Sequence, residues 1–379
     1  MKIARIATIP YSFIHWQKQF EYFSTHKMDV TLITGKNEHE EFLDELHGLR
    51  RIVIDLPREI SPLRDIQALI VLFLLFRKEK FDLVHSITPK GGLLVSIAAF
   101  LARVPVRIHT FTGQRWITLH GPMKMILKTC DQIIGLLSTR LYSDSPSQTE
   151  FLISNGLVSR KKIFTIHKGS LGGIDFEQFS KNKYPPACLN FISSNSLKLL
   201  YLGRINKDKG ICELVTALSE LLLENKDIEL ILAGPFEPHL DPLPEDIIHF
   251  IKTNPRIHAT GFVNQPQKYF AIADVFCLPS YREGFGTVVL EAAAFCLPTI
   301  GTKITGLVDA VEDGKTGILV ESRSVDQLKS AINSFYEDRK LIKSMGEEAY
   351  LRARRDFSCD MITHKQLEDY QNLLASKIC

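Results

Sequence analysis

The chain has 379 residues, of which 45% are hydrophobic and 23% charged, and its formal net charge at pH 7 is +3. This length exceeds one ordinary core and suits two domains, and the composition is that of a soluble globular protein. The small net charge argues against a nucleic-acid-binding protein. The seven cysteines include no CxxC pair, so neither a zinc site nor a disulfide framework is expected. This use of cysteine fits a protein of a reducing compartment.

The first half of the chain alternates apolar, strand-like runs with helix-like stretches. Strands are predicted at residues 2–8, 30–33, 51–55, 83–86, 106–111, 141–144 and 163–166. Helices are predicted between them at residues 14–25, 38–46, 63–78 and 92–101. Alternation of this kind predicts a parallel sheet with helices on both faces.

A second pattern of the same kind follows a break in composition. Residues 179–196 contain Pro185-Pro186 and a run of serine and asparagine, which is typical of a linker. Strands are then predicted at residues 199–203, 229–233, 257–261, 275–278, 299–302 and 317–320, with helices at 211–224, 247–253, 269–273, 287–295 and 325–336. The tail at 340–378 is predicted to be helical, with a break at Phe357-Ser358.

The predicted fold class is therefore α/β, with two doubly wound, Rossmann-like domains that face each other across a cleft. The predicted boundaries are 1–178 for the first domain, 179–196 for the linker and 197–357 for the second domain. Residues 358–379 are expected to cross back and complete the first domain. Ligands of such sheets bind beyond the carboxyl ends of the strands.

Segment 282–291 is the most informative part of the chain. It follows the apolar strand at 275–278, contains a glycine-bracketed turn and leads into a helix, with Glu283 and Glu291 at its two ends. A strand, glycine turn and helix present backbone N–H groups to a phosphate. The two carboxylates would repel phosphate, so we expect them to accept hydrogen bonds from hydroxyls. A ligand that combines hydroxyls with phosphate is a sugar nucleotide.

A second motif follows the first strand of the second domain. Gly203 begins a turn there, and Arg204 and Lys209 lie within it before the next helix. A diphosphate leaving group gains negative charge as its bond to carbon breaks, and a guanidinium and an ammonium both suit that charge. The alternative is a solvated turn with ordinary surface charges.

Together these residues resemble glycosyltransferase family 4, a retaining group with the GT-B fold. The matching residues are Gly203-Arg204, Lys209-Gly210, residues 279–286 and Glu291-Ala292, with further matches between 306 and 320. The resemblance covers nearly the whole chain and is densest from 199 to 320.

The resemblance implies a role for each matching residue. Arg204 and Lys209 would neutralise the diphosphate, Glu283 would contact the hydroxyls of the donor sugar, and these three form the predicted catalytic group. Glu291 would hold the ribose hydroxyls. The predicted donor-binding residues are Gly203, Phe262, Val263, Gly284, Phe285, Gly286 and Glu291. Family members generally need no metal, and no cofactor is expected besides the nucleotide sugar. In the usual description the departing phosphate helps to deprotonate the acceptor on the same face of the sugar.

The first domain is expected to bind the acceptor. Residues 88–92 follow a strand and open a helix, where Lys90 adds charge to exposed amides. This motif, with segments 109–114 and 169–175, is similar to bacterial capsule, O-antigen and N-glycan assembly transferases, which act on polyprenyl-diphosphate-linked sugars. The predicted acceptor-binding residues are Lys90, Gly91, His109 and Thr112. The alternatives are a solvent-exposed lysine at 90 and a buried, hydrogen-bonded histidine at 109.

Two segments bear on membrane contact. The longest apolar run, 66–76, is roughly half of the ~20 residues that a membrane span needs. It predicts a core helix, or one that also rests on a membrane surface, and basic residues follow it at 77–80. Segment 115–128 mixes basic and large apolar residues. A lipid-linked acceptor leads us to expect peripheral contact with an anionic membrane surface at the cytoplasmic side.

The sequence thus predicts a retaining glycosyltransferase that moves a hexosyl or N-acetylhexosaminyl group from a UDP-sugar to a polyprenyl-diphosphate-linked acceptor. Surface polysaccharide biosynthesis in bacteria is its expected setting. Two alternatives are a nucleotide-sugar epimerase of related fold and a non-catalytic partner subunit that keeps the fold. The interpretation as a dinucleotide-dependent dehydrogenase has less support, because no GxGxxG motif follows the first strand.

Overall fold

The computed structural model describes residues 1–36, 46, 48–57, 61–184, 195–237 and 241–376. The chain divides into two compact units. Unit 1 comprises Met1–Gly173 and Cys359–Cys379, and unit 2 comprises Ile174–Ser358. The predicted helix at 38–46 lies almost wholly outside the described residues, as does most of the predicted linker at 179–196.

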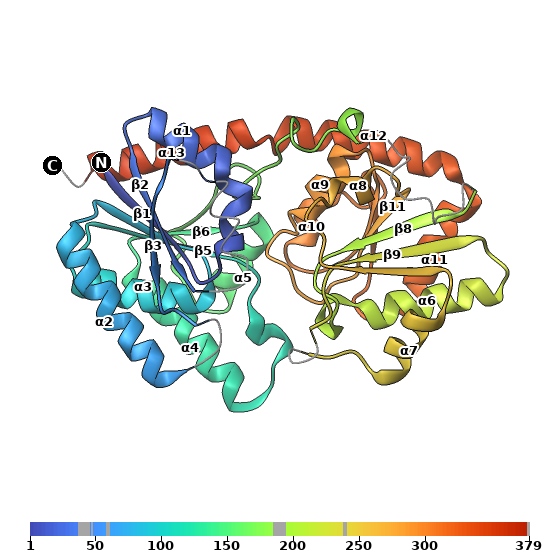
Figure 1. Cartoon of the computed structure of the whole chain (residues 1–379), viewed down its shortest axis with the longest axis horizontal. Coiled ribbons are helices and arrows are strands. Elements are labelled where there is room, and N and C mark those ends of the chain that lie inside the picture. Colours follow the sequence, from blue (N-terminus) through green and yellow to red (C-terminus); the bar gives the residue numbers. More distant parts are fainter. Residues whose placement is uncertain (37–45, 47, 58–60, 185–194, 238–240, 377–379) are drawn as a thin grey trace. The chain divides into compact units, whose positions relative to one another are not determined.

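Unit 1 contains a parallel sheet whose strands, within the described residues, run in the order β3-β2-β1-β4-β5-β6-β7 (Figure 1). The strands are β1 Lys2–Ala7, β2 Asp29–Gly35, β3 Arg50–Ile54, β4 Leu83–Ser86, β5 Val106–Phe111, β6 Arg140–Ser143 and β7 Ile163–Thr165. The α-helices are α1 Gln17–Thr25, α2 Pro62–Glu79, α3 Pro89–Leu101, α4 Gly121–Leu137, α5 Pro146–Ser154 and α13 Cys359–Ala375, with 3₁₀ helices at Pro10–Trp16 and Arg115–Thr118.

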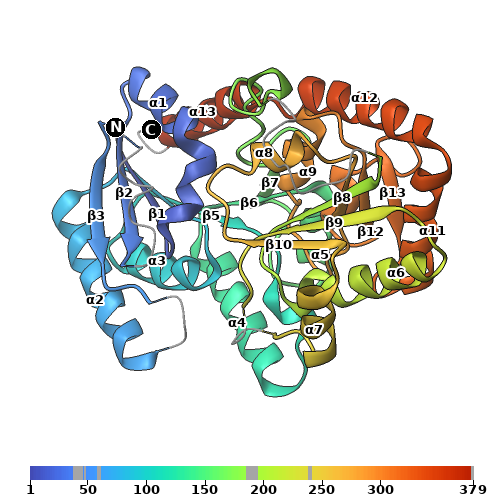
Figure 2. The ribbon, with the colours of Figure 1, turned by 45° about the vertical axis from the view of Figure 1, so that its right-hand side comes forward.

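Helices cover both faces of this sheet because alternate strand residues point to opposite sides. In β1, Ala4 and Ile6 share a core with α2 and α3. Ile3 and Ala7 point the other way and share a core with α1 and α13. Figures 1 and 2 show these two helix layers on either side of the strands.

The C-terminal helix α13 belongs to unit 1, which confirms the prediction that it returns to the N-terminal domain. A buried polar network holds it on the sheet. The guanidinium of Arg5 donates to the Tyr370 hydroxyl at 2.9 Å, and that hydroxyl also contacts His85. Asp369 accepts hydrogen bonds from Arg140 and Tyr142. Residues of the first and last segments of the chain therefore share one core.

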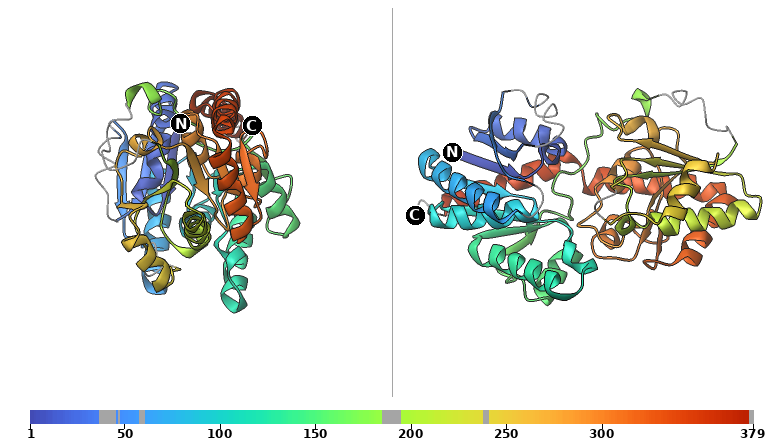
Figure 3. Two further views of the ribbon diagram at one scale, coloured as in Figure 1. Left: turned by 90° about the vertical axis from the view of Figure 1, so that its right-hand side faces the viewer. Right: turned by 60° about the horizontal axis from the view of Figure 1, so that its bottom comes forward.

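Unit 2 repeats the architecture, with described strands in the order β10-β9-β8-β11-β12-β13, all paired in parallel. The strands are β8 Leu197–Leu202, β9 Ile228–Ala233, β10 Ile257–Gly261, β11 Val275–Leu278, β12 Thr299–Thr302 and β13 Gly317–Val320. The helices are α6 Ile211–Leu223, α7 Glu245–Thr253, α8 Gln267–Phe270, α9 Val288–Ala294, α10 Leu307–Ala310, α11 Val325–Glu337 and α12 Arg339–Asp356, with 3₁₀ turns at Lys181–Lys183 and Lys207–Lys209. Helices α6 and α11 lie side by side (Figures 1 and 3).

The division between the units differs slightly from the predicted one. Unit 2 begins at Ile174, so residues 174–178 do not belong to the N-terminal domain. The reason is a pairing that the sequence does not reveal. The amide of Ile174 donates to the carbonyl of Phe357 at 2.8 Å, and Ile174 forms a bridge with Ser358. Helix α12 ends at Asp356 and α13 begins at Cys359, in agreement with the predicted break.

Candidate active site

The two motifs that predicted a sugar-nucleotide site follow neighbouring strands of unit 2. Strand β8 precedes the Gly203 turn, β11 precedes segment 282–291, and the two strands pair directly, with Val275 opposite Leu199. Their carboxyl ends therefore lie at one edge of the sheet. The loops also bond to each other, because the amide of Tyr281 donates to the carbonyl of Asp208 at 2.9 Å. The structure thus brings both motifs together within one unit.

Lys209 and Glu283 are in direct contact. The Nζ of Lys209 lies 2.5 Å from Oε1 of Glu283, and each side chain is 16% exposed. A second ion pair lies beside it between Arg282 and Asp208, at 2.5 Å. Because charge-assisted hydrogen bonds of this length are strong, both pairs hold the two loops together.

Arg204 is held by the loop that follows β9. Its Nη1 donates to Oε2 of Glu237 at 2.6 Å, and its carbonyl accepts a hydrogen bond from the buried Tyr201 hydroxyl at 2.6 Å. Burial by itself would lower the pKa of Arg204, but the carboxylates of Glu237 and Asp208 outweigh it and raise the pKa. The side chain remains one-third exposed, so the guanidinium can reach a ligand from a fixed position.

Glu291 lies in the first turn of α9 and is almost completely buried. Burial raises the pKa of this carboxyl to about 7, because a charged carboxylate loses hydration in the protein interior. A buried carboxyl with a raised pKa, in the helix that follows a glycine turn at the strand ends, is typical of a functional group. Its role towards ribose hydroxyls stays a prediction.

The other predicted donor residues lie in the loops after β8 and β11 and in a third loop after β10. Gly203 directly follows β8, and Gly284 and Gly286 belong to the turn between β11 and α9. The side chain of Phe285 is buried against Phe357, with ring centroids 5.1 Å apart, which leaves its backbone for the predicted contact. Phe262 and Val263 follow β10, where Phe262 is 42% exposed and Val263 packs on the core of unit 2.

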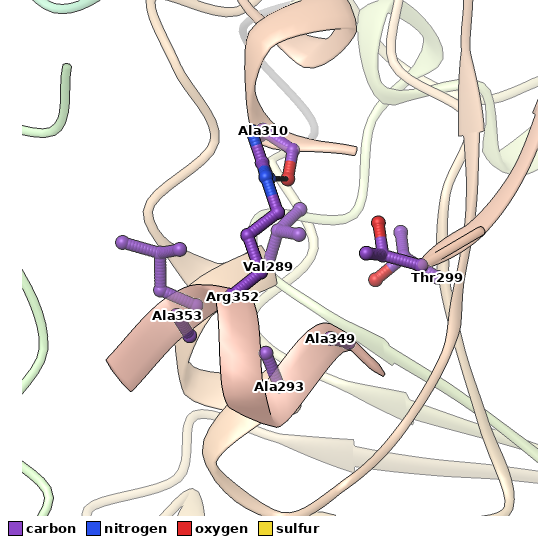
Figure 4. A pocket seen from close by; sticks show the side chains of 9 residues that line it. Val289, Ala293, Thr299, Ala310, Ala349, Arg352 and Ala353 are labelled. Carbon is purple, nitrogen blue, oxygen red and sulfur yellow. Dashed lines mark hydrogen bonds between the residues drawn. The ribbon is translucent and has the colours of Figure 1, made fainter. Parts of the chain in front are cut away.

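A small cavity lies beside α9, the helix that follows the Glu283–Gly286 turn (Figure 4). It is lined by residues of α9 and α12, and Arg352 crosses it to donate hydrogen bonds to the carbonyls of Asp309 and Ala310 at the end of α10, both at 2.5 Å. Gly306, just before α10, lies so close to Gly284 that a Cβ would stand 2.5 Å from the Gly284 carbonyl oxygen. Arg352 therefore supports the Glu283–Gly284 turn through α10.

The predicted acceptor residues lie in unit 1, at the start of α3. The ammonium of Lys90 pairs with the carboxylate of Asp65 in α2, and both side chains are less than one-fifth exposed. This contradicts the alternative of a lysine that projects into solvent. Gly91 packs against Thr88, whose hydroxyl accepts a hydrogen bond from the Thr8 amide at 3.1 Å. Whether Lys90 contacts an acceptor stays a prediction.

His109 has the geometry of the structural alternative. It is 1% exposed, its Nδ1 lies 2.9 Å from the Ser86 hydroxyl, and burial lowers its pKa to about 3. It lies so close to Gly92 that a Cβ there would stand 2.3 Å from the ring. We therefore correct the expectation that His109 binds the acceptor: its ring packs beneath α3. Thr112 lies beyond β5, and its carbonyl accepts hydrogen bonds from Gln114 and Gln148 at 2.6 and 2.5 Å.

Sequence reasoning missed Glu237, Asn206, Asp208 and Arg282 as members of the site. Glu237 had one recognisable signal, since it lies a few residues beyond the strand at 229–233, at the same edge of the sheet as the two motifs. No sequence pattern indicated which carboxylate would pair with which cation.

Comparisons with known proteins agree with this geometry. The family description "Glycosyl transferases group 1" matches residues 190–352, and "Glycosyl transferase 4-like" matches residues 5–140. Among solved structures, sucrose-phosphate synthase of Thermosynechococcus elongatus superposes with a TM-score of 0.81 at 19% identity, covering 99% of this chain and 100% of that one. Anabaena HepE, solved with UDP and glucose, gives a TM-score of 0.79 at 18% identity, covering 98% of this chain and 99% of that one. The fold is that of the GT-B glycosyltransferases.

Sequence relatives narrow the assignment. The capsular polysaccharide biosynthesis glycosyltransferase CapM of Staphylococcus aureus is 31% identical over 98% of this chain and 97% of its own length. A UDP-Gal:alpha-D-GlcNAc-diphosphoundecaprenol alpha-1,3-galactosyltransferase of Escherichia coli is 28% identical over 86% of this chain and 84% of its own. The chain belongs to glycosyltransferase family 4, in the branch of capsule and O-antigen assembly enzymes. It is an enzyme, which decides against a non-catalytic subunit and favours transfer over epimerisation.

Proposed function

We propose that this glycosyltransferase moves a hexosyl or N-acetylhexosaminyl group from a UDP-sugar to a sugar hydroxyl on a polyprenyl-diphosphate-linked acceptor, with retention of configuration. The observation that carries the proposal is the cluster of Arg204, Lys209 and Glu283 at one edge of the unit 2 sheet, with Glu291 in the following helix. The names of the Escherichia coli and Staphylococcus aureus relatives support a lipid-linked acceptor and capsule assembly.

The geometry suggests how the donor would enter. A diphosphate would take the ammonium of Lys209 away from its partner Glu283, and the freed carboxylate would then accept hydrogen bonds from the sugar hydroxyls. Arg204 would supply a second, forked contact to the phosphates. One ion pair thereby connects binding of the phosphate to binding of the sugar.

The chemical step would follow from these contacts. The bond between C1 of the sugar and the β-phosphate oxygen breaks, and the acceptor hydroxyl forms a new bond to C1 on the same face. Its proton passes to the departing phosphate, so no protein base is needed. Arg204 and Lys209 stabilise the charge that grows on the leaving UDP, which is the usual role of cations placed at a developing oxyanion.

Product analysis tests this function. With a UDP-sugar and a short polyprenyl-diphosphate sugar, the enzyme should form a glycosylated lipid whose new linkage keeps the anomeric configuration of the donor. Activity should survive chelation of divalent metal. Conversion of the UDP-sugar to another UDP-sugar without acceptor would instead identify an epimerase.

Lys90 provides a prediction for the acceptor side. Lys90→Ala should raise the KM for the lipid-linked acceptor about tenfold or more, because it removes a charge-assisted hydrogen bond to the diphosphate. Asp65→Asn is the matched control, since it removes the partner of Lys90 but keeps its charge, and the acceptor KM should stay equal or fall. Steady-state kinetics check both variants, and an unchanged KM and kcat in Lys90→Ala would rule out the contact.

Unit 1 has a surface that suits a membrane. None of the described helices is long and apolar enough to cross a bilayer. Helix α2 buries Ala68, Leu72 and Phe76 and partly buries three further apolar residues against the same core, namely Leu69, Phe73 and Leu75. The exposed apolar residues of α2 and α4 are Leu63, Ile66, Ile70, Val71, Leu74, Met123, Met125, Ile126 and Leu136. Both helices pack against α3, and basic residues accompany them at 77–78, 80, 124 and 128. We propose that this surface rests on anionic lipid headgroups.

Vesicle sedimentation tests the surface. Replacing Leu74 and Met125 by glutamate together should weaken binding to anionic vesicles by about tenfold or more, because each inserted side chain contributes roughly 1.5–3 kcal/mol. Leu223→Glu, which changes a still more exposed apolar residue of unit 2, should have no effect. Equal binding of the wild type to neutral and anionic vesicles would count against the basic residues.

A further inference from the structure

Within the described residues, Arg204, Lys209 and Arg282 at the proposed diphosphate site each pair with a carboxylate. The pairs are Arg204 with Glu237 at 2.6 Å, Lys209 with Glu283 at 2.5 Å, and Arg282 with Asp208 at 2.5 Å. Two of the carboxylates have another explanation. Glu283 has the proposed role towards the sugar, and Asp208 belongs to the 3₁₀ turn whose backbone joins the two loops. For Glu237 only the contact with Arg204 has been described so far, and no effect of its charge on a ligand.

Glu237 is a fixed part of the sheet edge rather than a mobile surface residue. The loops after β8 and β9 continue side by side beyond the strands. The amide of Ile205 donates to the carbonyl of Pro235 at 2.8 Å, and the amide of Glu237 donates to the carbonyl of Ile205 at 3.3 Å. The Glu237 carboxylate is 16% exposed and also accepts a hydrogen bond from Asn206 at 3.2 Å.

The same carboxylate has two opposite effects on a diphosphate. By its hydrogen bond it holds the Arg204 guanidinium in one orientation, which favours a forked contact with phosphate oxygens. By its negative charge it repels any diphosphate that Arg204 binds, because the two anions then share one guanidinium in a partly buried site. The first effect needs only an acceptor oxygen, whereas the second needs the charge.

We propose that Glu237 is a positioning residue for Arg204 whose negative charge also weakens the enzyme's hold on the nucleoside diphosphate, so that UDP leaves after transfer. This inference rests on the proposed UDP-sugar chemistry. Tight binding of the diphosphate in every state would not accelerate the chemical step and would slow product release. A carboxylate at this place limits that binding and keeps the guanidinium oriented.

Glu237→Gln separates the two effects, because the amide oxygen can still accept from Arg204 and Asn206 while the charge is gone. In calorimetry we expect this variant to bind UDP about tenfold more tightly than the wild type. Binding of uridine, which has no phosphate, should not change. Added salt should reduce the difference for UDP, and UDP should become a stronger product inhibitor. Glu337→Gln, which removes the carboxylate that pairs with Lys226 elsewhere in unit 2, should leave UDP affinity unchanged.

Glu237→Ala removes the positioning of Arg204 in addition to the negative charge. Because it removes the acceptor oxygen as well, its kcat should fall well below that of Glu237→Gln at saturating donor. UDP binding to Glu237→Gln that is equal to or weaker than that of the wild type would overturn the inference, and so would equal tightening for UDP and uridine. A wild-type protein that binds no UDP would instead overturn the proposed donor, and this inference with it.

Discussion

Replacing Arg204 by alanine should lower kcat by about a hundredfold to a thousandfold, with a smaller change in the KM for the donor. The guanidinium lies at the edge of the unit 2 sheet, fixed by Glu237 and one-third exposed. The charge on the leaving diphosphate is largest in the transition state, so loss of the cation affects the chemical step more than ground-state binding. Arg204→Lys should recover part of the rate, because it restores the charge but not the fork. Initial rates at saturating donor and acceptor check this.

A matched control comes from the same unit. Lys226→Ala removes a cation that pairs with the exposed Glu337. Lys226 lies just before the amino end of β9, whereas Arg204 and Glu237 lie beyond the carboxyl ends of the strands. The substitution should change kcat by no more than about twofold, as surface substitutions usually do. Since Arg204→Ala leaves Glu237 without this partner, circular dichroism should confirm that the variant is folded. A folded Arg204→Ala enzyme with nearly wild-type kcat would contradict the role assigned to this residue.

Glu291→Gln should make the protein more stable and the nucleotide site weaker. Burial raises the pKa of Glu291 to about 7 in the folded state, from an ordinary value of 4.5. A group with a raised folded pKa stabilises the fold in its protonated form, and this stabilisation is lost as pH rises through about 7. The wild type therefore loses stability between about pH 5 and pH 8, and glutamine should recover up to about 3 kcal/mol at the upper end.

The same substitution should weaken UDP binding, because an amide cannot replace the charged acceptor of two ribose hydroxyls. Wild-type affinity for uridine, which carries no titrating phosphate, should fall as pH decreases below about 7, where Glu291 becomes protonated, and this dependence should disappear in Glu291→Gln. Denaturant unfolding and calorimetry across this range check both effects. Glu224→Gln, which changes an exposed glutamate of unit 2, should alter neither. A Glu291→Gln protein with unchanged UDP affinity would remove Glu291 from the site.

Much of the fold could be predicted from the sequence because parallel strands buried on both faces are continuous apolar runs. The run at 199–203 became β8, and the runs at 275–278 and 299–302 became β11 and β12 with the predicted bounds. The predicted break at Phe357-Ser358 agrees with the structure, where it separates α12 from α13. The unit boundary at Ile174 could not be predicted, because it depends on a hydrogen bond to Phe357, which lies far along the chain.

The site was predictable to the level of residue type and strand edge. Arg204, Lys209 and Glu283 could be placed together because their motifs follow adjacent parallel strands. The ion pair between Lys209 and Glu283 could not be predicted, because it depends on the shapes of two loops whose residues are 74 positions apart in the sequence. For His109, the residue type was misleading because the burial of its side chain could not be predicted. Its type suggested a functional group, but the glycine at 92 lets α3 cover the ring and leaves it neutral and buried.

A crystal structure with UDP bound tests the central claim most directly. We predict that the diphosphate oxygens lie within hydrogen-bond distance of Arg204 and Lys209, that the ribose hydroxyls meet Glu291, and that Lys209 no longer pairs with Glu283. UDP bound away from the edge formed by β8 and β11, or bound there with its phosphates turned from both cations, would contradict the account.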